Sequence, residues 1–388
     1  MEADWPDAYR VNRYVQGENA DADAVEALSG FRRFPAWMWR NADILDFVGW
    51  LRTRNDSLDP AKRVGFYGLD LYSLHASIEA VLTYLDKVDS DGARRARYRY
   101  ACFEHFGEDP QTYGYAAGFG LSHTCESEVV AQLIDLQHCA IEYARRDGWI
   151  AAERFFDAQQ NARLVKDAEQ YYRTMFRGQI SSWNLRDQHM AETLDTLAEH
   201  LDLRHHSAKV LVWAHNSHLG DARATQMGQM GECNVGQLVR QRYGGDCRLV
   251  GFTTYSGTVT AASNWDGPAE RKQIRPARPD SYEGLFHQVG IPAFTLTLEP
   301  GTHVTGGLRE PMLERAIGVV YPSICRRPNW PATTFRLGFL TSLTLSSIST
   351  RPEPLSHWRQ SRSILRNLPK HFPPAYSPLR TPMANWTT

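Results

Sequence analysis

The sequence predicts an α/β fold with three layers, in which helices cover both faces of a mostly parallel sheet and extend into long helical insertions. Short apolar runs that end in polar residues alternate along the chain with long amphipathic stretches. Strands that alternate with helices are typical of parallel sheets covered on both faces. With 388 residues, the chain is long enough for one large α/β domain or two of average size.

Each predicted element follows from its own pattern. Helices are predicted over the amphipathic stretches 74–87, 126–146, 150–177 and 184–202. Buried strands are predicted over four apolar runs: 64–70, 208–214, 247–254 and 293–298. Ligands of open α/β sheets bind outside the carboxyl ends of the strands. The polar residues that follow each predicted strand are therefore the first candidates for a site.

Charge divides the chain into two regions of different composition. The formal net charge of −1 excludes strong steering of the whole chain toward nucleic acid or acidic membranes. Residues 322–388, however, hold nine of the 43 Lys and Arg residues, one of the 44 acids and half of the 20 prolines. We expect a domain over residues 1–321 and a basic, unstructured tail over 322–388. A nucleic-acid-binding tail is the alternative interpretation.

The sequence carries no signal for a membrane or an oxidising compartment. No run of 18 apolar residues is present, and residues 1–6 read MEADWP, without a basic or apolar leader. The six cysteines include no CxxC pair, so neither a zinc ribbon nor a disulfide scaffold is expected. These features predict a cytoplasmic protein with reduced cysteines, no membrane contact, no cofactor and no required metal.

Two imidazoles follow the predicted strand 208–214 directly. The run WAHNSHLGD places His215 and His218 three residues apart in a loop at the carboxyl end of that strand. Histidine titrates near neutral pH and serves as general base, general acid or metal ligand. The alternative is a pair of structural histidines bonded to the backbone.

Three other motifs are more ambiguous. A carboxylate of the N-terminal run EADWPDAYRVNRYV could activate water, although this run also reads as a helix start with Asp4 as N-cap. Arg186 and Asp187 of SSWNLRDQHM could hold a substrate carbonyl or form a surface ion-pair network. The glycine-rich run 114–120 lacks the Gly-Lys-Ser/Thr of a phosphate loop, which excludes that kind of nucleotide site.

Taken together, these motifs resemble the erythromycin esterase family. The matching stretches follow the family order from residue 2 to about residue 321: EADWPDAYRVNRYV, FYGLDLYSL, DPQTYGYAAGFGLS, AEQYYRTMF, SWNLRDQHM, VWAHNSHLGDARAT, VGQLVRQRYG, YSGTVTAASNWDGPAERK, SYEGLF and LERAIGVVY. The resemblance implies a three-layer α/β fold and hydrolysis of an ester, a macrolactone in the best-known members, by water that a histidine activates.

The resemblance also implies roles for single residues. Glu2 matches the family's acidic residue, which would orient water, and His215 and His218 match its paired histidines. Asp70 and Arg186 match recurrent polar positions. We take Glu2, His215 and His218 as catalytic candidates, and assign substrate contacts to three residues: Asp70, Arg186 and Asn216. The expected partner is a small-molecule ester, and the sequence does not predict an oligomeric state.

The resemblance departs from the family pattern at both ends. No stretch of residues 1–388 matches the family's Gly-Glu-x-x-His-Gly segment, which supplies a general-base histidine, so the fold is expected to be incomplete at the N-terminus. From about residue 322, we expect a shifted reading frame: suitable codons for 326–354, read two nucleotides on, encode a string like the family's C-terminal DAVIHID strand. Two alternatives to an ester hydrolase therefore stand: a non-catalytic gene remnant, and a binding module with a basic tail.

Overall fold

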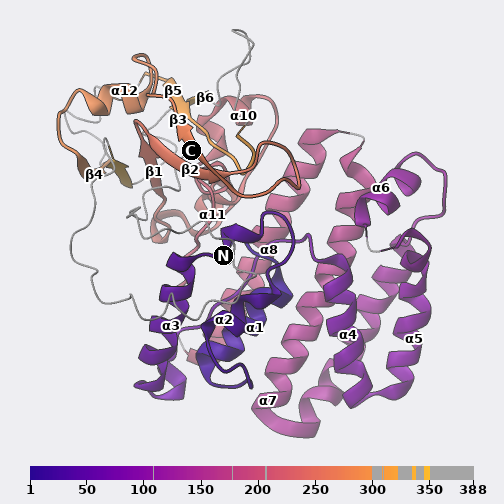
Figure 1. Ribbon diagram of the computed structural model, residues 1–388. Coiled ribbons are helices and arrows are strands. Elements are labelled where there is room, and N and C mark those ends of the chain that lie inside the picture. The colour runs from indigo at the N-terminus through magenta and orange to yellow at the C-terminus, as the bar shows by residue number, and fades with distance from the viewer. Residues whose placement is uncertain are drawn as a thin grey trace. The chain divides into compact units, whose positions relative to one another are not determined.

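The computed structural model describes residues 1–107, 109–176, 178–205, 208–298, 308, 310–321, 334–337 and 345–349 (Figure 1). The chain divides into two compact units. The first unit comprises Met1–Ala20 and Arg52–Trp213, and the second comprises Asp21–Leu51 and Ala214–Thr388.

The first unit is built from helices. Its long members α4, α5 and α7 lie side by side in Figure 1. Its helices are α1 (Trp5–Gln16), α4 (Leu74–Val88), α5 (Ser90–Tyr100), α6 (Pro110–Gly118), α7 (Glu126–Met175) and α8 (Gln179–His205), with short 3₁₀ turns at Pro60–Lys62 and Ala101–Phe106. The predictions of helices over 74–87 and 184–202 are confirmed.

One helix replaces the two that the sequence predicts over 126–146 and 150–177. Helix α7 runs without interruption for 50 residues. The intervening residues contain Gly148 but no proline. A single glycine costs a helix about 1 kcal/mol, whereas a proline would break its hydrogen-bond ladder. Packing against α4, α6 and α8 compensates for that cost.

Helix α1 begins where the sequence predicts. Asp4 occupies the N-cap position and a proline follows in the first turn. Gly17 ends the helix in the left-handed conformation at φ 77°, and its N–H donates to the carbonyls of the last turn. The Asp4 carboxylate does not cap α1; instead its Oδ1 accepts the N–H of Tyr72 at 3.2 Å. Asp4 thus joins the start of α1 to the segment before α4.

An apolar core joins these helices. Trp5 of α1, 1% exposed, packs by ring contacts against Tyr9, Tyr67 and Phe156. The core continues along the facing sides of α4, α5, α6 and α7 with buried members that include Leu71, Leu74, Val81, Leu85, Ala96, Tyr113, Leu136, Leu164 and Val165.

The glycine-rich run 114–120 serves close helix packing. Gly114 and Gly118 of α6 lie directly against the backbone carbonyls of Tyr172 and Arg173 in α7, where a Cβ atom would clash. Because glycine has no side chain, α6 approaches α7 more closely than any other residue would allow. This packing is consistent with the exclusion of a phosphate loop.

Residues 64–70 and 208–214 do not form the predicted strands. They meet residues 1–4 by single backbone bonds: the N–H groups of Leu69 and Asp70 donate to the carbonyls of Met1 and Ala3, and that of Glu2 donates to Trp213. A ladder needs a longer paired stretch, but the pairing ends at Asp4, where α1 begins. The prediction of strands is therefore wrong here, although the segments do lie side by side.

The second unit contains every strand that the structure describes. Strand β1 (Val250–Thr254) pairs in parallel with β7 (Leu345–Ser349), which pairs antiparallel with β4 (Ala293–Thr297). Two antiparallel pairs complete the set: β2 (Gly257–Ala261) with β3 (Glu270–Ile274), and β5 (Met312–Arg315) with β6 (Thr334–Leu337). The strands predicted over 247–254 and 293–298 are confirmed as β1 and β4.

The helices of the second unit precede β1 in the chain, except for α12, which lies between β3 and β4. Those of at least one turn are α2 (Ala24–Ala27), α3 (Ala42–Asp56), which runs into the first unit, α9 (Asn216–Leu219), α10 (Gln226–Gln229), α11 (Val235–Tyr243) and α12 (Tyr282–His287). Short 3₁₀ turns lie at Leu28–Gly30, Ala36–Met38, Ala222–Ala224 and Gly244–Asp246. A mixed, helix-rich α/β fold is thus confirmed, while the three-layer arrangement with a mostly parallel sheet stays a prediction.

Most of the basic tail lies outside the described residues. Only β6 and β7 are described within 322–388. The predictions of an unstructured extension, of a nucleic-acid-binding tail and of a shifted frame therefore stay predictions. No helix of the described residues is both long and apolar enough to cross a membrane.

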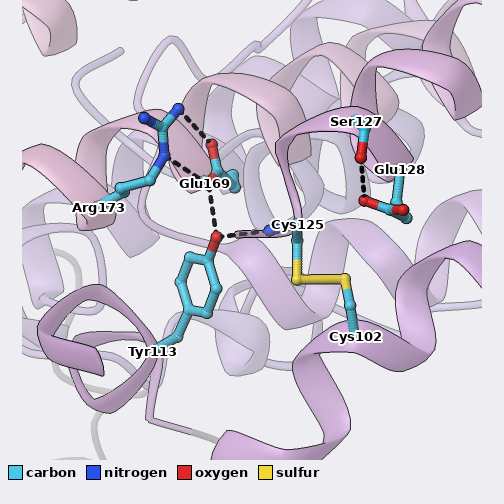
Figure 2. The surroundings of a disulfide bond; sticks show 7 residues. All are labelled: Cys102, Tyr113, Cys125, Ser127, Glu128, Glu169 and Arg173. Carbon is cyan, nitrogen blue, oxygen red and sulfur yellow. Dashed lines mark hydrogen bonds and ion pairs between the residues drawn. A yellow bond between two sulfur atoms is a disulfide. The ribbon is translucent and has the colours of Figure 1, made fainter. Parts of the chain in front are cut away.

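Two cysteines form a disulfide, contrary to the prediction that all six are reduced. Cys102, in the turn after α5, is joined to Cys125, the residue before α7, with their Cα atoms 5.9 Å apart (Figure 2). The sequence did not predict this pairing, because the two cysteines are 23 residues apart with α6 between them. The prediction of reduced cysteines is therefore wrong for this pair, while the cytoplasmic location stays a prediction.

Candidate functional site

The first unit brings three of the six candidate residues into one buried cluster. The Arg186 guanidinium on α8 binds Asp70 through two bonds, from Nε to Oδ1 at 2.9 Å and from Nη2 to Oδ2 at 2.7 Å. Its Nη2 also donates to Glu2 Oε1 at 2.8 Å. We call Glu2, Asp70 and Arg186 the Arg186 cluster. The alternative that Arg186 belongs to a surface ion-pair network is wrong. The Arg186 side chain is 12% exposed and that of Asp70 is 3% exposed, so both are buried.

The backbone around residues 1–4 positions the two carboxylates. Glu2 is fixed by its N–H bond to Trp213, and Asp70 is paired with Asp4 in an isolated parallel bridge. Oδ1 of Asp70 also accepts the N–H of Leu71 at 2.9 Å. Arg186 lies within helix α8, and from there its guanidinium reaches both carboxylates.

The aromatic ring of Tyr72 packs against the Arg186 cluster. The Arg186 guanidinium lies over the Tyr72 ring, with Cζ 4.9 Å from the ring centre, which adds a cation–π contact. The Tyr72 hydroxyl lies 3.3 Å from that of Tyr171, and the Tyr172 hydroxyl donates to the Tyr72 carbonyl at 3.2 Å. Tyr72 was not among the predicted site residues, although it follows Asp70 by two residues in the motif FYGLDLYSL.

Electrostatics keep the cluster ionised. Burial alone would lower the pKa of the Arg186 guanidinium, but the charges of Asp70 and Glu2 outweigh it and hold this pKa well above its usual value. Burial raises the pKa of the Tyr72 phenol well above its usual range, although Arg186 opposes the shift. At neutral pH the cluster therefore contains a charged guanidinium and a neutral phenol.

The other three candidates lie in the second unit, in the loop His215–Gly220. We call this segment the histidine loop; it contains the short helix α9. His215 is the N-cap of α9: its Nδ1 accepts the N–H of Ser217 at 3.2 Å and lies 2.7 Å from the Ser217 hydroxyl. Its Nε2 lies 3.1 Å from the carbonyl of Ile317. A carbonyl only accepts, so this geometry assigns the ring proton to Nε2 and makes His215 a neutral imidazole.

Asn216 anchors the histidine loop to a strand edge. Its Nδ2 donates to the Phe252 carbonyl of β1 at 2.7 Å, and its Oδ1 accepts the Phe252 N–H at 3.2 Å. The Asn216 amide thus makes the pair of hydrogen bonds that the backbone of a neighbouring strand would make with Phe252. These two hydrogen bonds explain why an asparagine stands at position 216, without a contact to substrate.

His218 is a buried residue, 2% exposed. Its backbone N–H donates to the carbonyl of His215 at 2.9 Å, which closes the turn. Asn234 supports the same turn from α11, because its Nδ2 donates to the carbonyls of Ser217 at 2.7 Å and Gly220 at 2.5 Å. The loop is therefore fixed on two sides, by β1 and by α11.

Geometry within each unit limits what the sites can do. The Arg186 cluster offers a carboxylate, Glu2, that is 12% exposed and could accept a proton from water. The histidine loop offers an imidazole whose tautomer is fixed. Within the described part of the chain, no group of three or more His, Cys, Asp or Glu side chains is placed to hold a metal ion.

Comparison with known proteins relates this chain to one family. The family model for erythromycin esterase matches residues 1–337, so the match extends beyond residue 321, where the composition changes.

Three solved structures share the fold. A Bacillus cereus protein without a named function and a succinoglycan biosynthesis protein both have TM-scores of 0.66, with 19% and 18% identity over 90% of this chain and 79% and 78% of theirs. A mutant of the erythromycin esterase EreC in its open conformation has a TM-score of 0.60, with 14% identity over 91% of this chain and 83% of its own. At these identities the likeness is one of fold.

Proposed function

Because the chain belongs to the erythromycin esterase family, we propose that it hydrolyses an ester bond of a small molecule, with water as the nucleophile. The observation that carries the proposal is the Arg186 cluster. A buried guanidinium that holds two carboxylates is costly to desolvate, and such arrangements occur preferentially at functional sites. A carboxylate held by arginine keeps its charge and its direction, which suits the orientation of a water molecule.

Each candidate residue has a role in this proposal. Glu2 orients the attacking water, while Asp70 and Arg186 fix the direction of the Glu2 carboxylate. The family resemblance assigns His215 a separate role, in which its Nε2–H, which faces the Ile317 carbonyl, donates to an oxyanion. Asn216 positions His215 by anchoring the loop to β1. His218 is a catalytic candidate on the family resemblance alone.

A macrolactone is the finer assignment of the substrate, and it links the protein to antibiotic response. Its support is the family and the EreC neighbour, whose name refers to erythromycin. Erythromycin and a simple p-nitrophenyl ester, incubated separately with the purified chain, distinguish a macrolactone hydrolase from an esterase of broader range. Ring opening is followed by mass spectrometry as the addition of one water.

The test of the mechanism is the substitution His215→Ala. Removal of a hydrogen-bond donor to the oxyanion lowers kcat by about 10²–10³-fold, and we expect kcat/KM to fall at least a hundredfold. His138→Ala is the matched control, because His138 is an exposed histidine on α7. Melting curves of both variants establish that the fold is retained.

Two results would contradict this proposal. Unchanged turnover by His215→Ala removes His215 from the mechanism. A wild-type chain that melts cooperatively but turns over neither substrate favours the non-catalytic alternative.

A further inference from the structure

Glu283 is a buried carboxylate that connects two strands of the second unit. It lies in the first turn of α12 and is 1% exposed. Its Oε1 accepts the Thr253 hydroxyl of β1 at 2.6 Å. The same oxygen accepts the backbone N–H of Arg315, the last residue of β5, at 3.0 Å. We call these two hydrogen bonds the Glu283 bridge.

On β1, the Glu283 bridge ends beside the residue that anchors the histidine loop. Thr253 directly follows Phe252, whose N–H and carbonyl bind the Asn216 amide at 3.2 Å and 2.7 Å. Thr253 is itself buried, and a buried hydroxyl without a partner is costly, which favours retention of its bond to Glu283. The carboxylate is thus fixed to the strand that holds Asn216.

Beyond β5, the Glu283 bridge holds the segment that faces the His215 ring. Ile317 stands two residues after Arg315, and its carbonyl lies 3.1 Å from His215 Nε2. The residues between Arg315 and Val319 belong to no helix or strand. This short segment is fixed again at Val319, whose carbonyl accepts the Ala262 N–H at 2.8 Å. The place of the Ile317 carbonyl therefore depends on both ends of the segment, and Glu283 holds one of them.

The Glu283 bridge uses only one oxygen of the carboxylate. Both bonds end on Oε1, while Oε2 is buried without a hydrogen-bond partner in the described part of the chain. The Arg315 guanidinium supplies neither bond, because the bridge reaches its backbone N–H and its Nη2 donates to the Arg275 carbonyl at 2.5 Å. Glutamine also carries an Oε1 acceptor, so it can make both bonds without a charge. The bridge thus requires an acceptor in a fixed place.

We propose that Glu283 is a positioning residue for His215. By holding β1 and the end of β5 together, it keeps the Ile317 carbonyl opposite Nε2, and a carbonyl in that place favours the tautomer with its proton on Nε2. This inference rests on the proposed function, in which that proton is donated to an oxyanion. Glu283 acts through two backbone segments rather than on the reacting atoms.

The first test follows the His215 ring proton by NMR. In protein labelled with ¹⁵N-histidine, long-range ¹H–¹⁵N spectra report the tautomer of each imidazole, and His215→Ala identifies the His215 signals. We expect a proton on Nε2 in the wild type, and Glu283→Ala should speed its exchange with solvent by about tenfold, because the segment opens more often. Glu283→Gln should restore the wild-type rate, because both bonds to Oε1 remain.

Ser281→Ala is the matched control for a merely structural role. Ser281 caps the same helix, since its Oγ accepts the Gly284 N–H at 3.2 Å, but its hydroxyl is not part of the Glu283 bridge. Loss of a cap destabilises a helix, so the melting temperature should fall while the exchange of the His215 proton stays unchanged. If Glu283→Ala does not fold, Thr253→Val replaces it, because it removes only the bond on β1.

Kinetics test whether Glu283 acts through His215. A small displacement of a catalytic group costs up to about 10²-fold in rate. Since Val319 still holds the other end of the segment, we expect Glu283→Ala to lower kcat for p-nitrophenyl acetate by about tenfold, with KM little changed. In the His215→Ala background, Glu283→Ala should have no further effect, because the two residues act as one unit.

Four results would overturn the inference. They are a wild-type His215 proton on Nδ1, unchanged proton exchange in Glu283→Ala, equal acceleration in Ser281→Ala, and no restoration by Glu283→Gln. Additive losses in the double variant would likewise contradict action through His215. The exchange measurement needs no substrate, so it tests the positioning by Glu283 even if the chain hydrolyses no ester. Failure of the proposed function is thereby distinguished from failure of this inference.

Discussion

The Arg186 cluster and the histidine loop hold their polar side chains by different means. In the Arg186 cluster, one guanidinium binds carboxylates that are 184 and 116 residues away in the chain. In the histidine loop, His215 binds Ser217 two residues on, and Asn216 binds the backbone of β1. The cluster depends on buried charge and the loop on neutral hydrogen bonds. The two regions should therefore differ in stability, in pH dependence and in how well a sequence predicts them.

The largest effect is expected from Arg186→Met, which removes the guanidinium that Glu2 and Asp70 share. The substitution leaves two carboxylates in a buried site, and breaking such a pair costs about 3–5 kcal/mol. We expect the free energy of unfolding in urea to fall by about that amount. The matched control is Arg94→Met, because the side chains of Arg94 and its partner Asp91 are 79% and 69% exposed; exposed pairs contribute about 0–1 kcal/mol.

Equal losses in the two variants would contradict the contrast between buried and exposed pairing. A loss below 1 kcal/mol in Arg186→Met would show that Glu2 and Asp70 are solvated in the native protein. The difference between the two variants is the informative quantity, because both remove one arginine from a helix.

A buried carboxylate of α7, Asp167, contributes to the pH dependence of the first unit. Asp167 Oδ2 lies 2.7 Å from His189 Nδ1, and its Oδ1 lies 2.8 Å from Lys166 Nζ. Burial opposes ionisation of Asp167, but His189 and Lys166 outweigh it and lower the pKa of this carboxyl to about 2. A lowered carboxyl pKa stabilises the fold above pH 4, and this stabilisation is lost as the pH falls through about 2.

Asp167→Asn measures this contribution. The shift from 3.8 to about 2 corresponds to about 2 kcal/mol. We expect the free energy of unfolding of the wild type to exceed that of Asp167→Asn by an amount that shrinks by about 2 kcal/mol between pH 6 and pH 2. Asp91→Asn, at a 69% exposed site, should show no comparable change. A difference that stays constant with pH would mean that Asp167 titrates normally.

Local patterns were sufficient to predict several helices. Helix α4 and the start of α1 follow from their periodicity and from Asp4 and its neighbouring proline. The extent of α7 did not follow, because tertiary packing overrides a single glycine in the middle of a long helix. The strands predicted at 64–70 and 208–214 failed for a related reason: an apolar run forms a strand only where a partner offers a ladder.

The candidate site residues were predictable from the sequence, but their contacts with one another were not. Motifs identified Glu2, Asp70, Arg186 and His215 one by one, but no local rule indicates that Arg186 binds both carboxylates. The disulfide was missed because its two cysteines meet only after α6 has folded back. Contacts between distant residues, rather than residue types, are what the sequence leaves undetermined.

The smallest effect is expected from Asn216→Ala, which tests whether the histidine loop is held by neutral bonds. The substitution removes two hydrogen bonds to Phe252, whose backbone groups can bind water instead, so unfolding should become easier by only about 1 kcal/mol. Catalysis should suffer more than stability: His215 loses its anchored position, and we expect kcat/KM for p-nitrophenyl acetate to fall about tenfold. Asn264→Ala, at an exposed site of the same unit, is the control. A loss of several kcal/mol would contradict the contrast, because the loop would then be as essential to the fold as the buried charges of the Arg186 cluster.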